Sequence, residues 1–219
     1  MRSSVARGAL VTAAVACMVL AAGCSNPFAP PGGGGGGGGD VEYKIRTTPE
    51  NVLYNLRQAY EYMNAEEYLD CLAQGFTFHL SEDDWGGGGL PKTWDKLEET
   101  QIHNNMFSED SDVEDIALIL TEISTVFDPG ESPTDPADDR WEHKEAVDLR
   151  VTVGGDLTYL ATAPALFVLQ RDIDQVGPNL EELWEVIDWY DLGDEGMRSF
   201  ETGPQEQQVS IGALKALFR

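Results

Sequence analysis

Cysteine and histidine are scarce in this sequence, with three residues of each among 219. His79, His103 and His143 lie far apart along the chain, and the absence of HExxH and CxxC motifs leaves no zinc-ligand spacing. No GxSxG or SxxK motif marks a nucleophilic serine. The eight consecutive glycines at residues 32–39 lack the GK[ST] ending of a phosphate-binding loop. We therefore predict neither a metal site nor a cofactor.

Basic residues are also few. The sequence has 14 Lys and Arg residues against 39 Asp and Glu residues, which gives a formal net charge of −25. Nucleic-acid binding requires Lys and Arg to neutralise phosphates, so this composition excludes a nucleic-acid partner. An anionic lipid surface would also repel the chain. Any association with a membrane must therefore come from an anchor.

Long apolar segments are absent beyond the N-terminal region. Residues 8–23 carry no charge and follow Arg2 and Arg7, a pattern typical of a secretory signal. This run is shorter than the ~20 apolar residues that a transmembrane helix needs. We therefore predict export without an integral membrane segment.

The end of the predicted signal, LAAGC at residues 20–24, resembles a bacterial lipobox. In the commonest lipobox a leucine stands three places before the cysteine, whereas Ala21 holds that place here. The resemblance implies a signal peptide at 1–23 and a lipid such as palmitate on Cys24. Because Ser25 rather than aspartate follows, it also implies an outer-membrane position in the bacterial cell envelope. The alternative is a secreted protein in which this cysteine is incidental.

Residues 24–46 are rich in glycine and proline, which predicts a flexible tether spanning roughly 25 Å. Cys17 would leave with the signal and Cys24 would be lipidated, so Cys71 has no partner for a disulfide. We interpret Cys71 as a buried packing residue rather than a nucleophile.

Residues 47–219 have the length of one domain. Thr48 and Pro49 predict the start of an amphipathic helix, and Pro164 predicts a bulge or an edge position in a strand. Helices are expected at 49–63, 66–73 and 93–107 (with Thr93 as N-cap), a loop at 81–91, and strands at 76–80, 113–127, 141–153, 157–171 and 183–192. Helices followed by a run of antiparallel strands predict an α+β domain with helices on one face of a curved sheet.

Three segments resemble the NTF2-like or SnoaL-like superfamily, as found in uncharacterised bacterial lipoproteins. They are TPENVLYNLRQAYEYMNAEEYLDCLAQGFTFHL, KTWDKLEETQIHNNMFS and LWEVIDWYDL, and the closing SIGALKALFR is similar to a tail from the same group. The resemblance implies a cone in which a bent sheet wraps around the first long helix. Some members are isomerases, dehydratases or hydrolases with an acid/base residue in the cone, and others bind ligands or subunits. Pairing through the outer sheet face, which is common in the superfamily, makes a homodimer a further hypothesis.

Three residues could carry acid/base chemistry in such a cone. His143 and Glu145 share a strand face with an apolar run, so they could form a proton-transfer pair inside the cone, or they could lie in solvent beyond the helices. Asp188 and Asp191 lie near the end of the last strand, where one carboxylate could face inward. His79 alternates with Phe76, Phe78 and Leu80, which predicts that it points away from the core.

Aromatic residues could line a hydrophobic pocket or could be ordinary core. The pocket candidates are Tyr54, Tyr60, Trp94, His103 and Trp189. Since no catalytic constellation is evident, the leading hypothesis is an envelope lipoprotein that binds a small hydrophobic ligand or a protein partner without catalysis. The alternative is a SnoaL-like isomerase, dehydratase or hydrolase that uses His143, Glu145 or Asp188.

Overall fold

The structure is a computed structural model that describes residues 41–127, 140–155, 157–178, 182–193 and 206–219. The predicted signal peptide, Cys24 and the glycine run lie outside the described residues. Within the described residues the chain forms five helices and seven strands. In chain order they are α1 (Pro49–Glu61), α2 (Ala65–Asp70), β1 (Leu72–His79), α3 (Glu82–Gly88), β2 (Thr93–Asp95), α4 (Lys96–Met106), β3 (Val113–Phe127), β4 (Arg140–Val153), β5 (Leu157–Val176), β6 (Glu182–Asp191), β7 (Glu206–Val209) and α5 (Ile211–Ala216).

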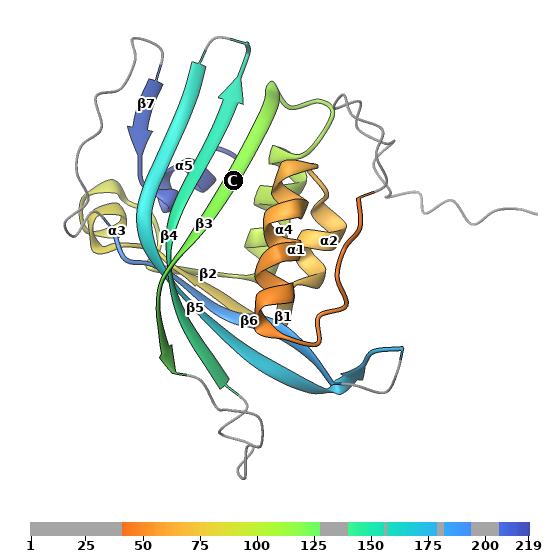
Figure 1. Ribbon diagram of the computed structural model, residues 1–219. Helices are drawn as coiled ribbons and strands as arrows, with labels where there is room; N and C mark the ends of the chain where they lie inside the picture. The colour runs from red at the N-terminus through yellow and green to blue at the C-terminus, as the bar shows by residue number, and fades with distance from the viewer. Residues whose placement is uncertain (1–40, 128–139, 156, 179–181, 194–205) are drawn as a thin grey trace, which may run out of the picture. The chain divides into compact units, whose positions relative to one another are not determined.

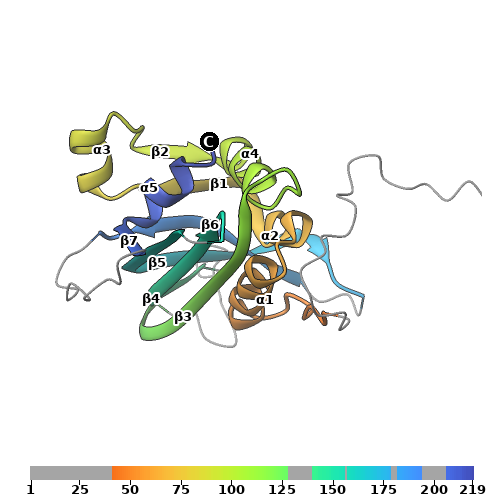
Figure 2. The ribbon, with the colours of Figure 1, turned by 90° about the horizontal axis from the view of Figure 1, so that it is seen from above.

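The strands form one curved sheet in the order β2-β1-β6-β5-β4-β3, with β7 added beside β5. Pairing is antiparallel except between β1 and β6 and between β5 and β7, which are parallel. Helices α1, α2 and α4 lie together on one face of the sheet, as Figures 1 and 2 show. The predicted α+β class with N-terminal helices on a curved sheet is confirmed.

Helix α1 forms as its capping residues predict. The Thr48 hydroxyl accepts a hydrogen bond from the Asn51 amide at 3.3 Å. Pro49 occupies the first turn, where no amide hydrogen is needed. The apolar stripe of the helix is fully buried and consists of Val52, Leu56, Ala59 and Tyr60. Burial of this stripe against the sheet stabilises the central layer of the core.

Strand β4 alternates between buried and more exposed residues with the period of two expected for a strand. The aliphatic residues on its inner face lie in the core and are Val147, Leu149 and Val151. His143 and Glu145 precede them on the same face and are only 5% and 6% exposed. The interpretation in which this end of the strand extends into solvent is therefore wrong.

The predicted loop at residues 81–91 is also wrong, because part of it forms α3. Three acidic residues in the first turn interact favourably with the helix dipole, and the Ser81 hydroxyl donates to Asp84 Oδ2 at 2.9 Å. Gly89 ends the helix with φ of 74°, a left-handed conformation that glycine adopts without steric cost. The low helix propensity of the glycines concealed this short helix in the sequence.

Helix α4 begins later than predicted. Asp95 rather than Thr93 is its N-cap, and Asp95 Oδ1 accepts hydrogen bonds from the amides of Leu97 and Glu98. The preceding three residues form β2 and pair with β1. Strand β1 in turn begins at Leu72, within the range predicted for the second helix.

Pro164 occupies an edge position on one side of β5. Strand β5 pairs with β7 as far as Ala161 and with β6 from Ala165 onward, so Pro164 falls between two partners. The Pro164 carbonyl accepts a hydrogen bond from the Leu192 amide at 3.0 Å on that side. Because the nitrogen and carbonyl of one strand residue point the same way, the missing amide hydrogen breaks no ladder bond with β4.

Helix α5, for which no element was predicted, docks against β6 and α3. The Gly212 amide donates a hydrogen bond to Asp191 Oδ2 at 3.1 Å, and the Ser210 hydroxyl bonds Asp84. A Cβ atom on residue 212 would lie 2.6 Å from Asp84 Oδ2, so glycine is required for this close approach.

Candidate functional site

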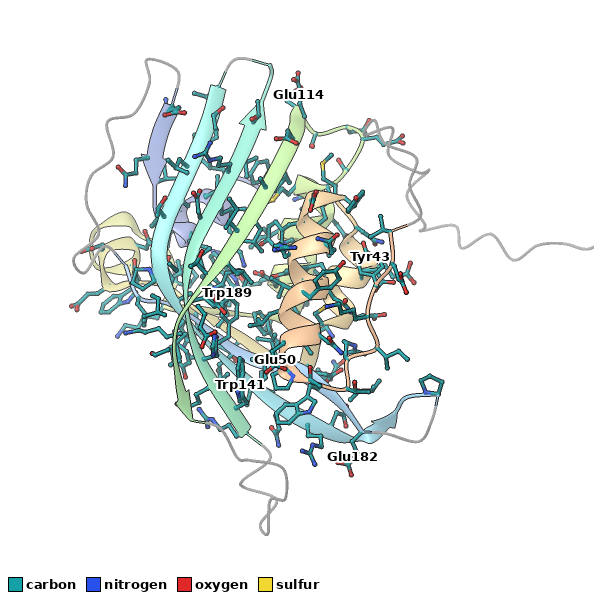
Figure 3. The ribbon with its side chains drawn as sticks, viewed as in Figure 1. Tyr43, Glu50, Glu114, Trp141, Glu182 and Trp189 are labelled. Atoms are coloured by element: carbon teal, nitrogen blue, oxygen red, sulfur yellow. The ribbon has the colours of Figure 1, made fainter. Side chains whose placement is uncertain are left out.

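A cleft with a volume of about 290 Å³ opens between α1, β3 and β4. Figure 3 shows Glu50 of α1 and Trp141 of β4, both of which line it. Its apolar and aromatic lining residues are Leu53, Tyr54, Leu120 and Trp141. Its polar lining residues are Glu50, Arg57, Glu122, His143 and Glu145. The lining is therefore mixed, unlike the hydrophobic pocket that was one of the two alternatives for the aromatic residues.

His143 and Glu145 form a contact pair in this cleft. They stand two residues apart on β4, so their side chains share a face, and His143 Nε2 lies 2.8 Å from Glu145 Oε1. The His143 ring stacks on Trp141 with 4.3 Å between centroids and 6° between planes. The second carboxylate oxygen, Glu145 Oε2, is buried and has no hydrogen-bond partner among the described residues.

Burial adjusts the protonation of both members of the pair. It raises the pKa of the Glu145 carboxyl to about 7, and the nearby Glu122 carboxylate contributes in the same direction. Burial also lowers the pKa of the His143 imidazole, which Glu122 and Glu50 partly oppose. Near neutral pH the Glu145 carboxyl therefore exchanges readily between its acidic and basic forms.

Of the five predicted pocket residues, Tyr54 lines the cleft. Tyr60, Trp94, His103 and Trp189 are at most 1% exposed and lie in the core. The core interpretation therefore holds for these four residues.

Asp188, the third predicted acid/base residue, lies apart from the cleft. Asp188 Oδ1 lies at hydrogen-bond distance, 2.7 Å, from His79 Nε2. The His79 ring stacks on the Tyr190 ring with 3.9 Å between their centroids. Both side chains of the His79–Asp188 pair are partly exposed. Asp191, by contrast, is buried and accepts hydrogen bonds from the amides of Gly193 and Gly212. Asp188 and the His143–Glu145 pair thus do not form one site.

A second polar group, here called the Glu99 cluster, lies wholly inside the core and consists of Tyr60, Tyr68, Trp94, Glu99, His103 and Lys215. Glu99 Oε1 accepts hydrogen bonds from Lys215 Nζ at 2.5 Å and from the Tyr68 hydroxyl. Glu99 Oε2 accepts one from Trp94 Nε1 at 2.7 Å. Although burial raises the pKa of the Glu99 carboxyl, the Lys215 charge and the hydrogen bonds from Lys215 and Tyr68 outweigh that effect, so the pKa is lowered and Glu99 is ionised.

His103 within the Glu99 cluster is held neutral. Burial lowers its pKa to about 4, with Lys215 acting in the same direction and Glu99 opposing it. His103 Nδ1 lies 3.0 Å from the Glu99 carbonyl, which can only accept, so Nδ1 carries the proton. His103 Nε2 therefore accepts a hydrogen bond from the Tyr60 hydroxyl at 2.7 Å. This fixed tautomer indicates a structural role for His103.

The sequence did not point to Glu99 or Lys215. They are 116 residues apart, and the weak apolar periodicity of α4 did not place Glu99 on a buried face. No local pattern predicts that these two charges meet. The pair was therefore inaccessible to motif-based reasoning.

Cys71 is buried, and burial raises the pKa of its thiol to about 12. A thiol in that state is a poor nucleophile at neutral pH, in agreement with its interpretation as a packing residue. Over the described ranges, no helix is long and apolar enough to cross a membrane. The same residues contain no group of three or more His, Cys, Asp or Glu side chains suited to a metal ion.

Neither a family profile nor a curated protein matches the chain. Among solved structures, it is similar to a conserved protein from Planctomyces limnophilus, with a TM-score of 0.48, 14% identity, and coverage of 65% of this chain and 91% of the other. A ketosteroid isomerase-like protein from Erwinia carotovora atroseptica has a TM-score of 0.43, 13% identity, and coverage of 69% and 95%. An NTF2-like protein with a cystatin-like fold from Novosphingobium aromaticivorans has a TM-score of 0.41, 10% identity, and coverage of 67% and 79%. The solved structures that this chain resembles thus include an NTF2-like and a ketosteroid isomerase-like protein.

Proposed function

We propose that this chain is a bacterial cell-envelope lipoprotein whose NTF2-like domain binds a small ligand in the cleft beside α1. The observation that carries the proposal is the buried His143–Glu145 pair, because Glu145 Oε2 lacks a hydrogen-bond partner among the described residues. A buried acceptor without a partner costs free energy. A ligand with a suitably placed donor offsets that cost.

The cleft favours a small, flat ligand that is neutral or cationic. Its volume of about 290 Å³ lies at the lower end of ligand pockets, which admits a compound of about one or two rings. Tyr54 and Trp141 offer aromatic surfaces. Glu50 and Glu122 outnumber Arg57 among the charged groups, so an anionic ligand is disfavoured.

Three single-ring probes, benzamide, benzylamine and benzoate, test this selectivity. Benzamide and benzylamine are expected to raise the Tm of the protein by roughly 2–4 °C for each kcal/mol by which the bound ligand stabilises the folded state. Benzoate is expected to leave the Tm unchanged. His143→Ala and Glu145→Ala are each expected to reduce the shifts by at least half. The measurement is thermal unfolding followed by circular dichroism.

His79→Ala is the matched control, since His79 forms an equivalent 2.7 Å pair with Asp188 outside the cleft. This variant is expected to retain the full shifts. Shifts that survive in His143→Ala and Glu145→Ala, or that are absent with every probe, contradict the proposed binding site.

The lipid anchor is a separate part of the proposal and depends on Cys24 in the lipobox-like segment. In a Gram-negative host fed an alkyne analogue of palmitate, the wild type is expected to be labelled and to stay in the outer-membrane fraction after a salt wash. Cys24→Ser is expected to lose the label and become soluble after cell disruption, while Cys71→Ser keeps both properties. Labelling of Cys24→Ser, or an unlabelled wild type, contradicts the anchor.

Proton transfer at the same cleft is the second candidate function. It is favoured by the pKa of about 7 for the Glu145 carboxyl, since an acid/base catalyst works best with a pKa near the operating pH. Ionised Glu145 would take a proton from a carbon next to a carbonyl and return a proton to the same position.

Exchange of the α-hydrogens of cyclohexanone in D₂O, followed by NMR, tests this candidate. Exchange is expected to be faster with the protein than in buffer alone. The rate is expected to rise as pH increases through about 7, because only ionised Glu145 accepts a proton. Glu145→Gln is expected to lower the rate by about 10²–10⁴-fold. If exchange is no faster than in buffer alone, or if Glu145→Gln does not slow it, proton transfer at the cleft is contradicted. Ligand binding without catalysis is then the remaining function.

A further inference from the structure

The ammonium group of Lys215 lies in a cage of aromatic rings and one carboxylate. Lys215 Nζ is 4.0 Å from the Trp189 ring centroid and 4.2 Å from that of Phe78. It also lies 2.5 Å from Glu99 Oε1 and 3.5 Å from the Tyr68 hydroxyl. Aromatic faces and a carboxylate both attract a cation, and their effect is strongest where water is excluded. Lys215 and Glu99 are both 0% exposed.

The cage is built entirely from elements other than the one that carries the lysine. Tyr68 belongs to α2, Phe78 to β1, Glu99 to α4 and Trp189 to β6, whereas Lys215 is on α5. Figure 3 labels Trp189, and the cage combines two residues of the sheet with two residues of the helices. The geometry of a receptor for an ammonium group is thus complete without α5.

The walls of the cage are held in place by contacts that do not involve the lysine. The Trp94 ring stacks on the Phe78 ring with 4.9 Å between centroids, and Trp94 Nε1 donates a hydrogen bond to Glu99 Oε2. Phe167 packs against Trp189 at 4.7 Å, and His103 stacks on Tyr68 at 3.7 Å. Such support preorganises a binding site and lowers the entropy lost on binding.

We propose that this cage is a binding site for a primary alkylammonium group and that Lys215 is its built-in occupant. A primary ammonium fits because it carries N–H donors for Glu99 and Tyr68 as well as a positive charge for the two rings. A quaternary ammonium has the charge but no donor. The site is distinct from the His143–Glu145 cleft, with which it shares no residue.

Replacing Lys215 with alanine removes the side-chain atoms from Cγ to Nζ, which are the atoms of n-propylammonium. In the full-length Lys215→Ala chain, n-propylammonium chloride is expected to raise the Tm by roughly 5 °C or more over NaCl at equal ionic strength, with an increase that grows with the logarithm of its concentration. If this variant is unfolded in NaCl, n-propylammonium is expected to restore its near-UV circular dichroism. 1-Propanol and tetramethylammonium chloride, which lack the charge and the donors respectively, are expected to do neither.

Two further variants complete the test. Lys215→Met fills the space of the lysine side chain with an apolar chain. Glu99→Gln/Lys215→Ala removes the buried negative charge, so that the protein needs no cation to fold. Both are expected to show no specific response to n-propylammonium, like the wild type. An equal response to 1-propanol, a response in Lys215→Met, or no response in Lys215→Ala overturns the proposal.

Discussion

Lys215→Ala is expected to lower the free energy of unfolding by about 3–5 kcal/mol in the absence of added amines. The variant leaves the ionised Glu99 carboxylate in the core without its cation, at a position that is 0% exposed. The loss measures the cost of an uncompensated buried charge, which is larger than the attraction between two solvated charges. Chemical denaturation in NaCl provides the measurement.

Arg219→Ala is the matched control for this loss. Arg219 pairs with Glu98, so this second ion pair also joins the C-terminal residues to α4, but both of its side chains are more than a third exposed. Its removal is expected to cost less than about 1 kcal/mol because solvent screens the pair. Similar losses in the two variants contradict the assignment of the Lys215–Glu99 contact as a buried ion pair.

Trp189→Ala is expected to destabilise the protein by about 3–5 kcal/mol. Trp189 is 0% exposed, and its ring contacts Phe78, Phe167 and the Lys215 ammonium. Substitution therefore creates a cavity in the core and also removes one wall of the cage around Lys215. The same denaturation experiment measures the effect.

Trp85→Ala serves as a control with the same change in side chain. Lys92 Nζ lies 4.1 Å from the Trp85 ring centroid, much as Lys215 does at Trp189, but Trp85 is only partly buried on α3. Its expected cost is about 1 kcal/mol. In the Trp189→Ala/Lys215→Ala double variant, the two losses are expected to differ from additivity by about 0.5–3 kcal/mol, because the side chains touch. Strict additivity argues against the cation–ring contact.

Local patterns in the sequence predicted those elements that local interactions determine. The Thr48 and Pro49 signals mark the start of α1, and alternation along β4 placed His143 and Glu145 on one face. Alternation alone does not reveal what lies opposite that face. Whether α1 encloses the pair depends on packing between segments distant in the chain, so the two interpretations of the pair could be separated only with the structure.

The features that the sequence did not predict, such as helix α3, depend on contacts with distant segments rather than on a local sequence pattern. The glycines of α3 argue against a helix on intrinsic propensity, yet the helix is fixed by Asp84, whose carboxylate bonds Ser81 and Ser210. The aromatic candidates were correctly identified as inward-facing, but their composition could not distinguish a cavity lining from a filled core. That distinction came from the burial of four of the five candidates, and beside one of them, Trp189, the Lys215 side chain from the C-terminal helix occupies the core.

The parallel pairing of β1 with β6 also has a kinetic consequence. It joins segments from opposite ends of the domain, as in the contact between His79 and Asp188, which are 109 residues apart. Closing so long a loop costs chain entropy before any pairing compensates for it, and domains rich in such distant contacts fold in roughly milliseconds to seconds. The central strand pairing is therefore expected to form late, and β1 has only the three-residue β2 as a sheet partner until β6 arrives.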